Sequence, residues 1–309
     1  SKDGDLFRST GQGVGQADPA LLNLQQHLRL NAAAQEREIQ KGLTRLGMNI
    51  KGRPLYKKGP ELLGVPAAET TGERLGLVLL IRFPDCMQDV TMQPYEVDAY
   101  CNQPGFTNFG NHGSVYDYFS RQSQQRFRYC GLVTAYYTAL HPRDYYTDEA
   151  YPSPFRAMDL VTEALNSLKD TGFDFKACDL NGDNKIDAVN ALYAGNRQNG
   201  WSEGLWPHRG WLTWTNAPPD ISEDVDYQIT DMSDELTLGT YVHENGHMVC
   251  DFPDLYDYGL SGNHSRGAGF FSLMSGVGPA TWPYNVDIYL KRAAGWTETL
   301  PLDSNSHFR

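Results

Sequence analysis

The sequence predicts a mixed α/β (α+β) core. Two apolar runs, Gly76–Ile81 and Ala188–Tyr193, have the length and composition of strands that are buried on both faces. Apolar residues recur at helical spacing over Ser114–Gln122 and Pro154–Lys169, and a closing helix is expected near Val286–Ala294. Strands that alternate with helices along a chain are typical of α/β and α+β domains.

Residues 1–72 differ from this core in composition. A Gly-rich start leads into a helical pattern from Pro19 to about Leu46, and Pro66–Gly72 has the composition of a linker. We therefore predict a mainly helical N-terminal segment over residues 1–72, acting as an accessory or pro-region, and a main domain over residues 73–309.

The bulk composition excludes some classes of partner. The 309 residues carry a net charge of −12, which argues against nucleic acid because phosphate binding requires basic patches. The longest apolar run, Leu77–Ile81, is far shorter than the ~20 residues of a membrane span. Because the chain starts at Ser1 without a methionine, we expect a secreted protein whose export signal is absent here. An odd number of cysteines, five, leaves open whether one or two disulfides form or all are free thiols.

His243, Glu244 and His247 form an HExxH pattern within a segment of helical character. Side chains four residues apart share one face of a helix, so the two imidazoles can bind one Zn²⁺. Glu244 is then close enough to accept a proton from a water at the metal. The sequence Ser233-Asp234-Glu235 is expected to start this helix.

An acidic, turn-like segment follows this helix directly. A third ligand is expected there, and the candidates are Asp251, Asp254 and Asp257. Two histidines held in a core beside a chance glutamate are the alternative interpretation of the whole pattern.

A second motif has the alternating oxygen donors of a calcium loop. Its donors are Asp179, Asn181, Asp183, Lys185 through its backbone carbonyl, and Asp187. Asn184 stands where an EF-hand has glycine, and Asn190 stands where it has a bidentate glutamate. We therefore predict a Ca²⁺ loop that is not an EF-hand, with an ion-free polar turn as the alternative.

Several segments, in matching order, resemble the immune inhibitor A-type metalloproteases, a secreted branch near the metzincin zinc proteases. They are Gly76–Asp85, Gly113–Ser123, the calcium-like loop with Ala188–Gly195, Leu205–Arg209, the HExxH pentad, Pro253–Asp257, Phe271–Gly276 and Leu290–Trp296. The resemblance covers about residues 73–298. It implies a metzincin-like zincin catalytic domain, over residues 73–309, with an active-site helix and a methionine turn.

The resemblance also implies roles for individual residues. His243, His247 and Asp254 would be zinc ligands, Glu244 the general base and Met274 the turn methionine.

One departure from the family pattern concerns the third ligand. The family places it ten positions beyond the first histidine, where this chain has Pro253, and the aspartate Asp254 comes at eleven. The extra residue can be accommodated if Asp251 adopts the left-handed conformation that aspartate tolerates. Asp251 and Asp257 therefore remain alternative ligands.

Two further residues are weaker candidates for the substrate cleft. His208 could orient substrate or be a structural histidine, and Tyr284 could donate to a developing oxyanion.

The predicted function is that of a secreted zinc endopeptidase that hydrolyses proteins or peptides with Glu244 as general base. The alternatives are a non-catalytic binding or adhesion protein stabilised by zinc and calcium, and a zinc hydrolase of another kind. The N-terminal segment holds no cysteine, so self-inhibition by residues 1–72 would require an acidic group such as Asp3 or Asp5.

Overall fold

The computed structural model describes residues 69–150, 154–200, 202–256 and 267–298, together with two short N-terminal strands. The chain divides into two units, Ser1–Leu55 and Tyr56–Arg309. In the first unit, β1 (Lys2–Asp3) pairs antiparallel with β2 (Leu6–Phe7). The predicted N-terminal helix lies outside the described residues, and the domain boundary at residue 72 stays a prediction.

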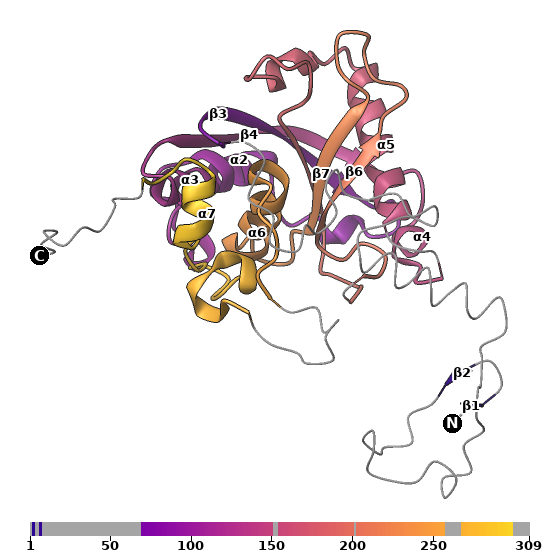
Figure 1. The fold of residues 1–309 in the computed structure, drawn as a ribbon. Helices are drawn as coiled ribbons and strands as arrows, with labels where there is room; N and C mark the ends of the chain where they lie inside the picture. The colour runs from indigo at the N-terminus through magenta and orange to yellow at the C-terminus, as the bar shows by residue number, and fades with distance from the viewer. Residues whose placement is uncertain are drawn as a thin grey trace, which may run out of the picture. The chain divides into compact units, whose positions relative to one another are not determined.

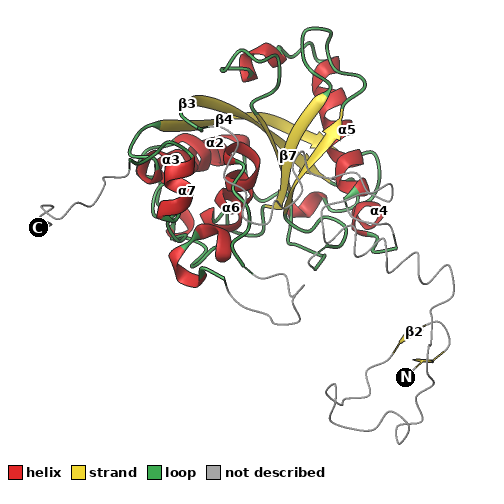
Figure 2. Cartoon of the chain, viewed as in Figure 1, coloured by secondary structure: helices red, strands yellow, loops and turns green. Residues whose placement is uncertain are grey.

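A five-stranded sheet is the centre of the second unit (Figure 2). Its strands are β3 (Gly72–Arg82), β4 (Phe127–Thr138), β5 (Ala188–Tyr193), β6 (His208–Thr213) and β7 (Asp224–Asp231). They lie in the order β4-β3-β5-β7-β6. Strands β4, β3, β5 and β7 are parallel, and β6 runs antiparallel to β7 at the edge of the sheet. The one antiparallel strand therefore lies at an edge.

Helices cover both faces of this sheet (Figure 1). One face packs against α2 (Pro94–Asn102), α3 (Val115–Gln122), α6 (Leu238–Cys250) and α7 (Ile288–Ala293), and the other against α5 (Phe155–Asp170), with α4 (Arg143–Thr147) beside it. Short 3-10 turns are η1 (Met87–Asp89), η2 (Asn108–Gly110), η3 (Phe175–Cys178), η4 (Gly269–Phe271) and η5 (Leu273–Ser275). Successive β3 residues alternate between the two cores: Val78 and Leu80 face α6, whereas Leu77 and Leu79 face α5.

A buried row of polar side chains crosses the sheet on the α6 side. Asn190 of β5 donates to the Tyr129 hydroxyl of β4 (2.8 Å), and Gln228 of β7 donates to Asn190 (3.1 Å). Gly76 of β3 lies between them, and a Cβ there would be 2.3 Å from the Tyr129 oxygen. Asn190 is therefore committed to the core and does not take the twelfth position of a calcium loop.

The predicted mixed α/β class is confirmed. The observed ends of β5, α3, α5 and α7 agree with the predicted ends to within two residues. Strands β4, β6 and β7 and helix α2 were not anticipated. All five cysteines are free thiols, so no disulfide forms. Within the described part of the chain, no helix has the length and hydropathy to cross a membrane.

Candidate metal centre

Helix α6 carries the HExxH residues, and it starts later than its sequence suggests. The N-cap is Thr237, whereas Ser233 adopts a left-handed conformation (φ 53°) before the helix, so the predicted start at Ser233 is wrong. The reason is a long-range contact. The buried Asn111 accepts from the Leu238 N–H (3.2 Å) and donates to the Leu236 carbonyl (2.7 Å). A distant side chain thus satisfies an N–H of the first turn that a local cap would otherwise satisfy.

The end of α6 turns the chain back toward the two histidines. Asp251 caps the helix in the left-handed conformation (φ 53°, ψ 27°) that the extra residue required. The Phe252 N–H then donates to the Gly246 carbonyl (3.1 Å), and the Leu255 N–H donates to the Met274 carbonyl (2.7 Å). These bonds fix the segment in which Asp254 lies.

Three side-chain atoms of His243, His247 and Asp254 meet at one point. The two Nε2 atoms are 3.1 Å apart, and Asp254 Oδ1 lies 3.3 Å from His243 Nε2 and 3.1 Å from His247 Nε2. Among the described residues, this is the group of His, Cys, Asp and Glu side chains whose ligand atoms converge closely enough to hold a metal ion.

The hydrogen bonds of the imidazoles decide their tautomers. His243 Nδ1 donates to the Leu273 carbonyl (3.0 Å) and His247 Nδ1 donates to the Phe252 carbonyl (2.6 Å), because a carbonyl can only accept. In the neutral rings both Nε2 atoms then present lone pairs to the Asp254 carboxylate. Such backbone bonds are the usual support of histidine ligands.

Three facing acceptors repel one another unless a proton or a metal cation lies between them. Ligands at the usual zinc distances form a tetrahedron with edges of about 3.3–3.5 Å. The observed separations of 3.1–3.3 Å fit such an ion. The charges around the His243 imidazole also favour a positive charge at this point. Burial lowers the pKa of His243, but the Asp254 hydrogen bond and the Glu244 and Asp254 charges outweigh it and raise that pKa to about 9.

Glu244 is buried beside this cluster. Burial raises the pKa of its carboxyl, against the lowering effect of the two imidazoles. The backbone of Arg209, the second residue of the edge strand β6, also lowers the pKa of this carboxyl slightly. A buried carboxyl with a raised pKa is suited to accept and return a proton.

The turn η5 packs directly against the two-histidine segment of α6. Met274 is fully buried, and its Sδ would lie 3.0 Å from a Cβ placed on Gly246, which stands immediately before His247. The neighbouring Leu273 supplies the carbonyl that orients His243. Close packing of this turn therefore depends on glycine at position 246.

Among the described residues, the other candidates are not part of this converging group. Asp251 Oδ1 is 3.7 Å from the Arg209 guanidinium, not in the cluster, and Asp257 lies outside the described residues. His208 is buried; its Nδ1 donates to the Trp206 carbonyl (2.6 Å) and its Nε2 lies 3.1 Å from the Tyr227 hydroxyl. Tyr284 packs against Phe270, with ring centroids 5.6 Å apart.

The predicted calcium loop is closed by its own hydrogen bonds. Asp179 accepts from the Asp183 N–H (3.0 Å) and from the Asn184 N–H (3.0 Å), and Asn184 is left-handed (φ 64°). Asp187 is tied to the Leu75 N–H (2.9 Å). The loop therefore has a defined turn geometry, and its binding of calcium stays a prediction.

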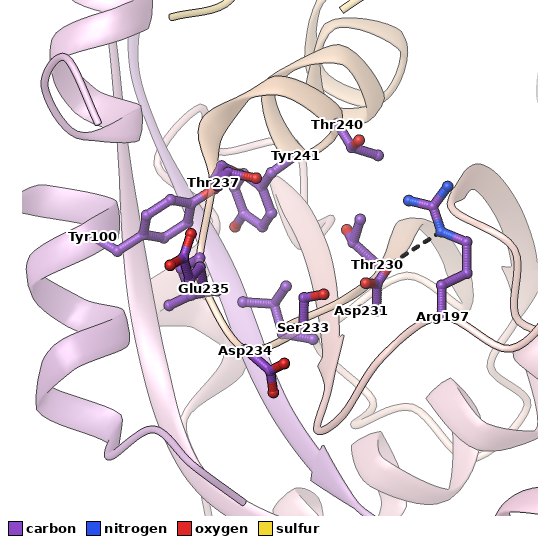
Figure 3. Close-up of a pocket in the computed structure, with 12 residues that line it drawn as sticks. Tyr100, Arg197, Thr230, Asp231, Ser233, Asp234, Glu235, Thr237, Thr240 and Tyr241 are labelled. Carbon is purple, nitrogen blue, oxygen red and sulfur yellow. Dashed lines mark hydrogen bonds and ion pairs between the residues drawn. The ribbon is translucent and has the colours of Figure 1, made fainter. Parts of the chain in front are cut away.

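A polar hollow of about 490 Å³ adjoins the start of α6 (Figure 3). Tyr100 of α2 and the Arg197–Asp231 ion pair (3.2 Å) lie on opposite sides of it, and Thr240 of α6 also lines it. The three converging residues do not line this hollow. Thr240 lies one helical turn before Glu244 on the same helix face, so the hollow adjoins the Glu244 side of α6.

Two residues that position the site were not found in the sequence. Asn111 holds the first turn of α6, and the backbone of Arg209 acts on the Glu244 carboxyl. Arg209 was visible only as part of a family-like segment, and Asn111 carried no signal because its partners are more than 120 residues away.

Comparisons with known proteins add little to this geometry. No model of a known protein family matches the chain, and no curated protein is significantly similar to it. Among solved structures, metalloproteinase-II from Bacteroides fragilis aligns with 13% sequence identity and a TM-score of 0.34, over 82% of this chain and 59% of that chain. This chain thus spans less than two thirds of that structure's length. A likeness this distant supports no inference about fold or function.

Proposed function

We propose that this chain is a zinc-dependent endopeptidase with His243, His247 and Asp254 as metal ligands. The proposal rests on three acceptor atoms, one from each of these residues, that lie within 3.3 Å of one another beside the buried Glu244. A purely structural zinc site is usually closed by four protein ligands, whereas three ligands leave a position for water or substrate. Glu244, a buried carboxyl with a raised pKa, can act as a general base, which favours catalysis over a binding or adhesion role.

In this mechanism Glu244 moves the proton. A zinc ion held by His243, His247 and Asp254 would supply Lewis acidity toward the peptide carbonyl and would lower the pKa of water. Glu244 accepts a proton from the attacking water and delivers it to the leaving amine. Its raised pKa suits both steps.

The edge strand β6 supports a peptide as the substrate. The Trp214 N–H donates to the Glu223 carbonyl (2.7 Å), so by the alternation of an antiparallel pair the N–H groups of Arg209 and Trp211 point away from β7. An extended chain can pair with an edge strand through its main chain. A peptide bound in this way would pass next to the Glu244 carboxylate.

The experiment is a comparison of Glu244→Gln with the wild-type protein on casein and on a peptide library. We expect peptide hydrolysis to fall by about 10²–10⁴-fold, because the general base is lost. Zinc content by elemental analysis should stay at the wild-type level. Glu73→Gln, at an exposed ion pair with Arg128, is the matched control and should keep full activity. Wild-type activity in Glu244→Gln would remove this residue from the mechanism.

Further parts of the proposal rest on the sequence. The resemblance to immune inhibitor A-type proteases favours a metzincin-like domain, with α6 as active-site helix and Met274 in a methionine turn. It also favours secretion, a structural Ca²⁺ ion in the Asp179–Asp187 loop, and protein substrates. Self-inhibition by residues 1–72 belongs to the same proposal, because a zinc protease requires control before release.

A further inference from the structure

A second, larger pocket lies beside α3, apart from the metal centre. Its volume is about 1200 Å³, and it is formed by α3, the turn after α3, the loop before it and the segment around Trp282. Most of its hydrogen-bonding side chains are uncharged. They include Thr107, Ser120, Gln124, Gln125 and Asn285.

Trp282 provides an aromatic surface in this pocket. Its side chain is 59% exposed, and one ring face stacks on His112, with centroids 4.1 Å apart and an angle of 28° between the planes. The backbone on both sides is fixed: the Trp282 N–H donates to the Pro279 carbonyl (3.0 Å), and the His112 N–H donates to the Thr281 carbonyl (3.0 Å). The indole is therefore held rigidly while most of it remains open to a ligand.

The opposite rim of the pocket has an unusual backbone. Gln124 and Gln125 are both left-handed (φ 53° and 64°), a conformation that is uncommon outside glycine, asparagine and aspartate. The Gln125 N–H donates to the Ser120 carbonyl (2.8 Å), which fixes this turn. Both side chains are exposed at the pocket, and consecutive backbone strain of this kind is found where function requires a particular geometry.

The chemistry of the lining selects among ligands. One cation, Arg121, and one carboxylate, Asp117, line the pocket, and Asp117 already accepts from the Ser114 and Gly105 N–H groups. A nucleic acid or a phosphorylated ligand needs more positive charge than this. A proline-rich peptide needs a groove lined by several aromatic side chains, whereas Trp282 and His112 form a single stack here.

We propose that this pocket binds a neutral oligosaccharide. A sugar ring has an apolar face of C–H groups that can stack on the exposed indole of Trp282. Its hydroxyls can exchange hydrogen bonds with the amides of Gln124 and Gln125, which offer both donors and acceptors, and can accept from the amide nitrogen of Asn285, whose oxygen already accepts from Gln122 (2.7 Å). The site is a carbohydrate-binding subsite that is separate from the zinc ligands and does not depend on the proposed hydrolysis.

The test uses the full chain and three neutral probes: chitotetraose, maltotetraose and N-acetyllactosamine. Saturation-transfer NMR detects binding, and titration of the tryptophan indole N–H signals gives the affinity. We expect at least one sugar to bind and Trp282→Ala to weaken it by about tenfold or more, because the stacking surface is lost. Gln124→Ala should weaken the same sugar without loss of the aromatic surface.

Phe271→Ala is the matched control, because Phe271 is an 85% exposed aromatic that does not line the pocket, and it should bind the sugar as the wild type does. The proposal is overturned if none of the three sugars binds at about 10 mM, a level that detects even weak sites. It is also overturned if Trp282→Ala, shown to be folded by circular dichroism, binds with wild-type affinity. Binding of a proline-rich decapeptide in place of the sugars, lost in Trp282→Ala, would assign the pocket to peptides instead.

Discussion

Replacing Asp254 by asparagine tests the metal centre most directly, with Asp251→Asn as its matched control. The two aspartates are three residues apart in one turn, and each was a candidate ligand. Only Asp254 has an oxygen within 3.3 Å of both imidazole Nε2 atoms. Asp251 instead lies 3.7 Å from the Arg209 guanidinium, with its side chain 38% exposed.

The two variants should differ by orders of magnitude in zinc affinity. Loss of a partner that merely orients a ligand weakens metal binding by about 10–100-fold, so loss of the charged ligand itself should exceed about 100-fold, or roughly 2.7 kcal/mol. Asp251→Asn removes a partly exposed ion pair worth about 0–1 kcal/mol, and asparagine tolerates the left-handed conformation as well as aspartate does.

The assay is competition for zinc with a fluorescent chelator, followed by peptide hydrolysis at saturating zinc. Asp254→Asn should lose both zinc and activity, and Asp251→Asn should keep zinc affinity within about threefold, which is under 1 kcal/mol. Zinc retained in Asp254→Asn and lost in Asp251→Asn would refute the assignment of the third ligand.

Three further predictions concern pH, calcium and latency. Burial lowers the pKa of His208 to about 4 from an unfolded value near 6.5, so the unfolded chain takes up the proton first. The free energy of unfolding should then fall by up to about 3 kcal/mol between pH 6.5 and 4, and less in His208→Gln; equal losses would contradict this. Calcium chelation should lower the melting temperature, and adding Ca²⁺, but not Zn²⁺, should restore it. Asp183→Ala should abolish this effect of chelation. An unchanged melting temperature in the wild type would indicate an ion-free turn. If the N-terminal segment inhibits the proposed hydrolysis, removing residues 1–55 should raise the specific activity. This deletion keeps the hydrogen bonds between Thr70 and the segment after α7. Unchanged activity would contradict the latency hypothesis.

The strands show where sequence reasoning succeeded and where it failed. β5 is buried along its whole length, so its apolar run was readable in the sequence. β7 also lies inside the sheet, but its inward-facing Gln228 and Thr230 are polar and hydrogen-bonded in the core, which removes the apolar signal. β4 is an edge strand of mostly intermediate burial, so it has no continuous apolar run.

The candidate centre divides in a similar way. The pair His243 and His247 with Glu244 was readable because helical spacing alone brings i and i+4 side chains together. The choice of Asp254 over Asp251 depended on a left-handed cap and on two backbone hydrogen bonds that turn the chain back. A sequence lists the acidic residues of a turn but not the direction in which each one points.

The sequence by itself determined the local chemistry: two imidazoles and a carboxylate at helical spacing, an acidic turn after them, and a polar loop before a buried strand. Only the tertiary structure decided which aspartate completes the cluster, that Asn111 starts α6, and that the backbone of β6 acts on the Glu244 carboxyl. The physical reason is range. Helical periodicity acts over four residues, whereas the contact that starts α6 joins residues 127 apart and the bond that orients His243 joins residues 30 apart. Such contacts form only when the sheet and helices are packed.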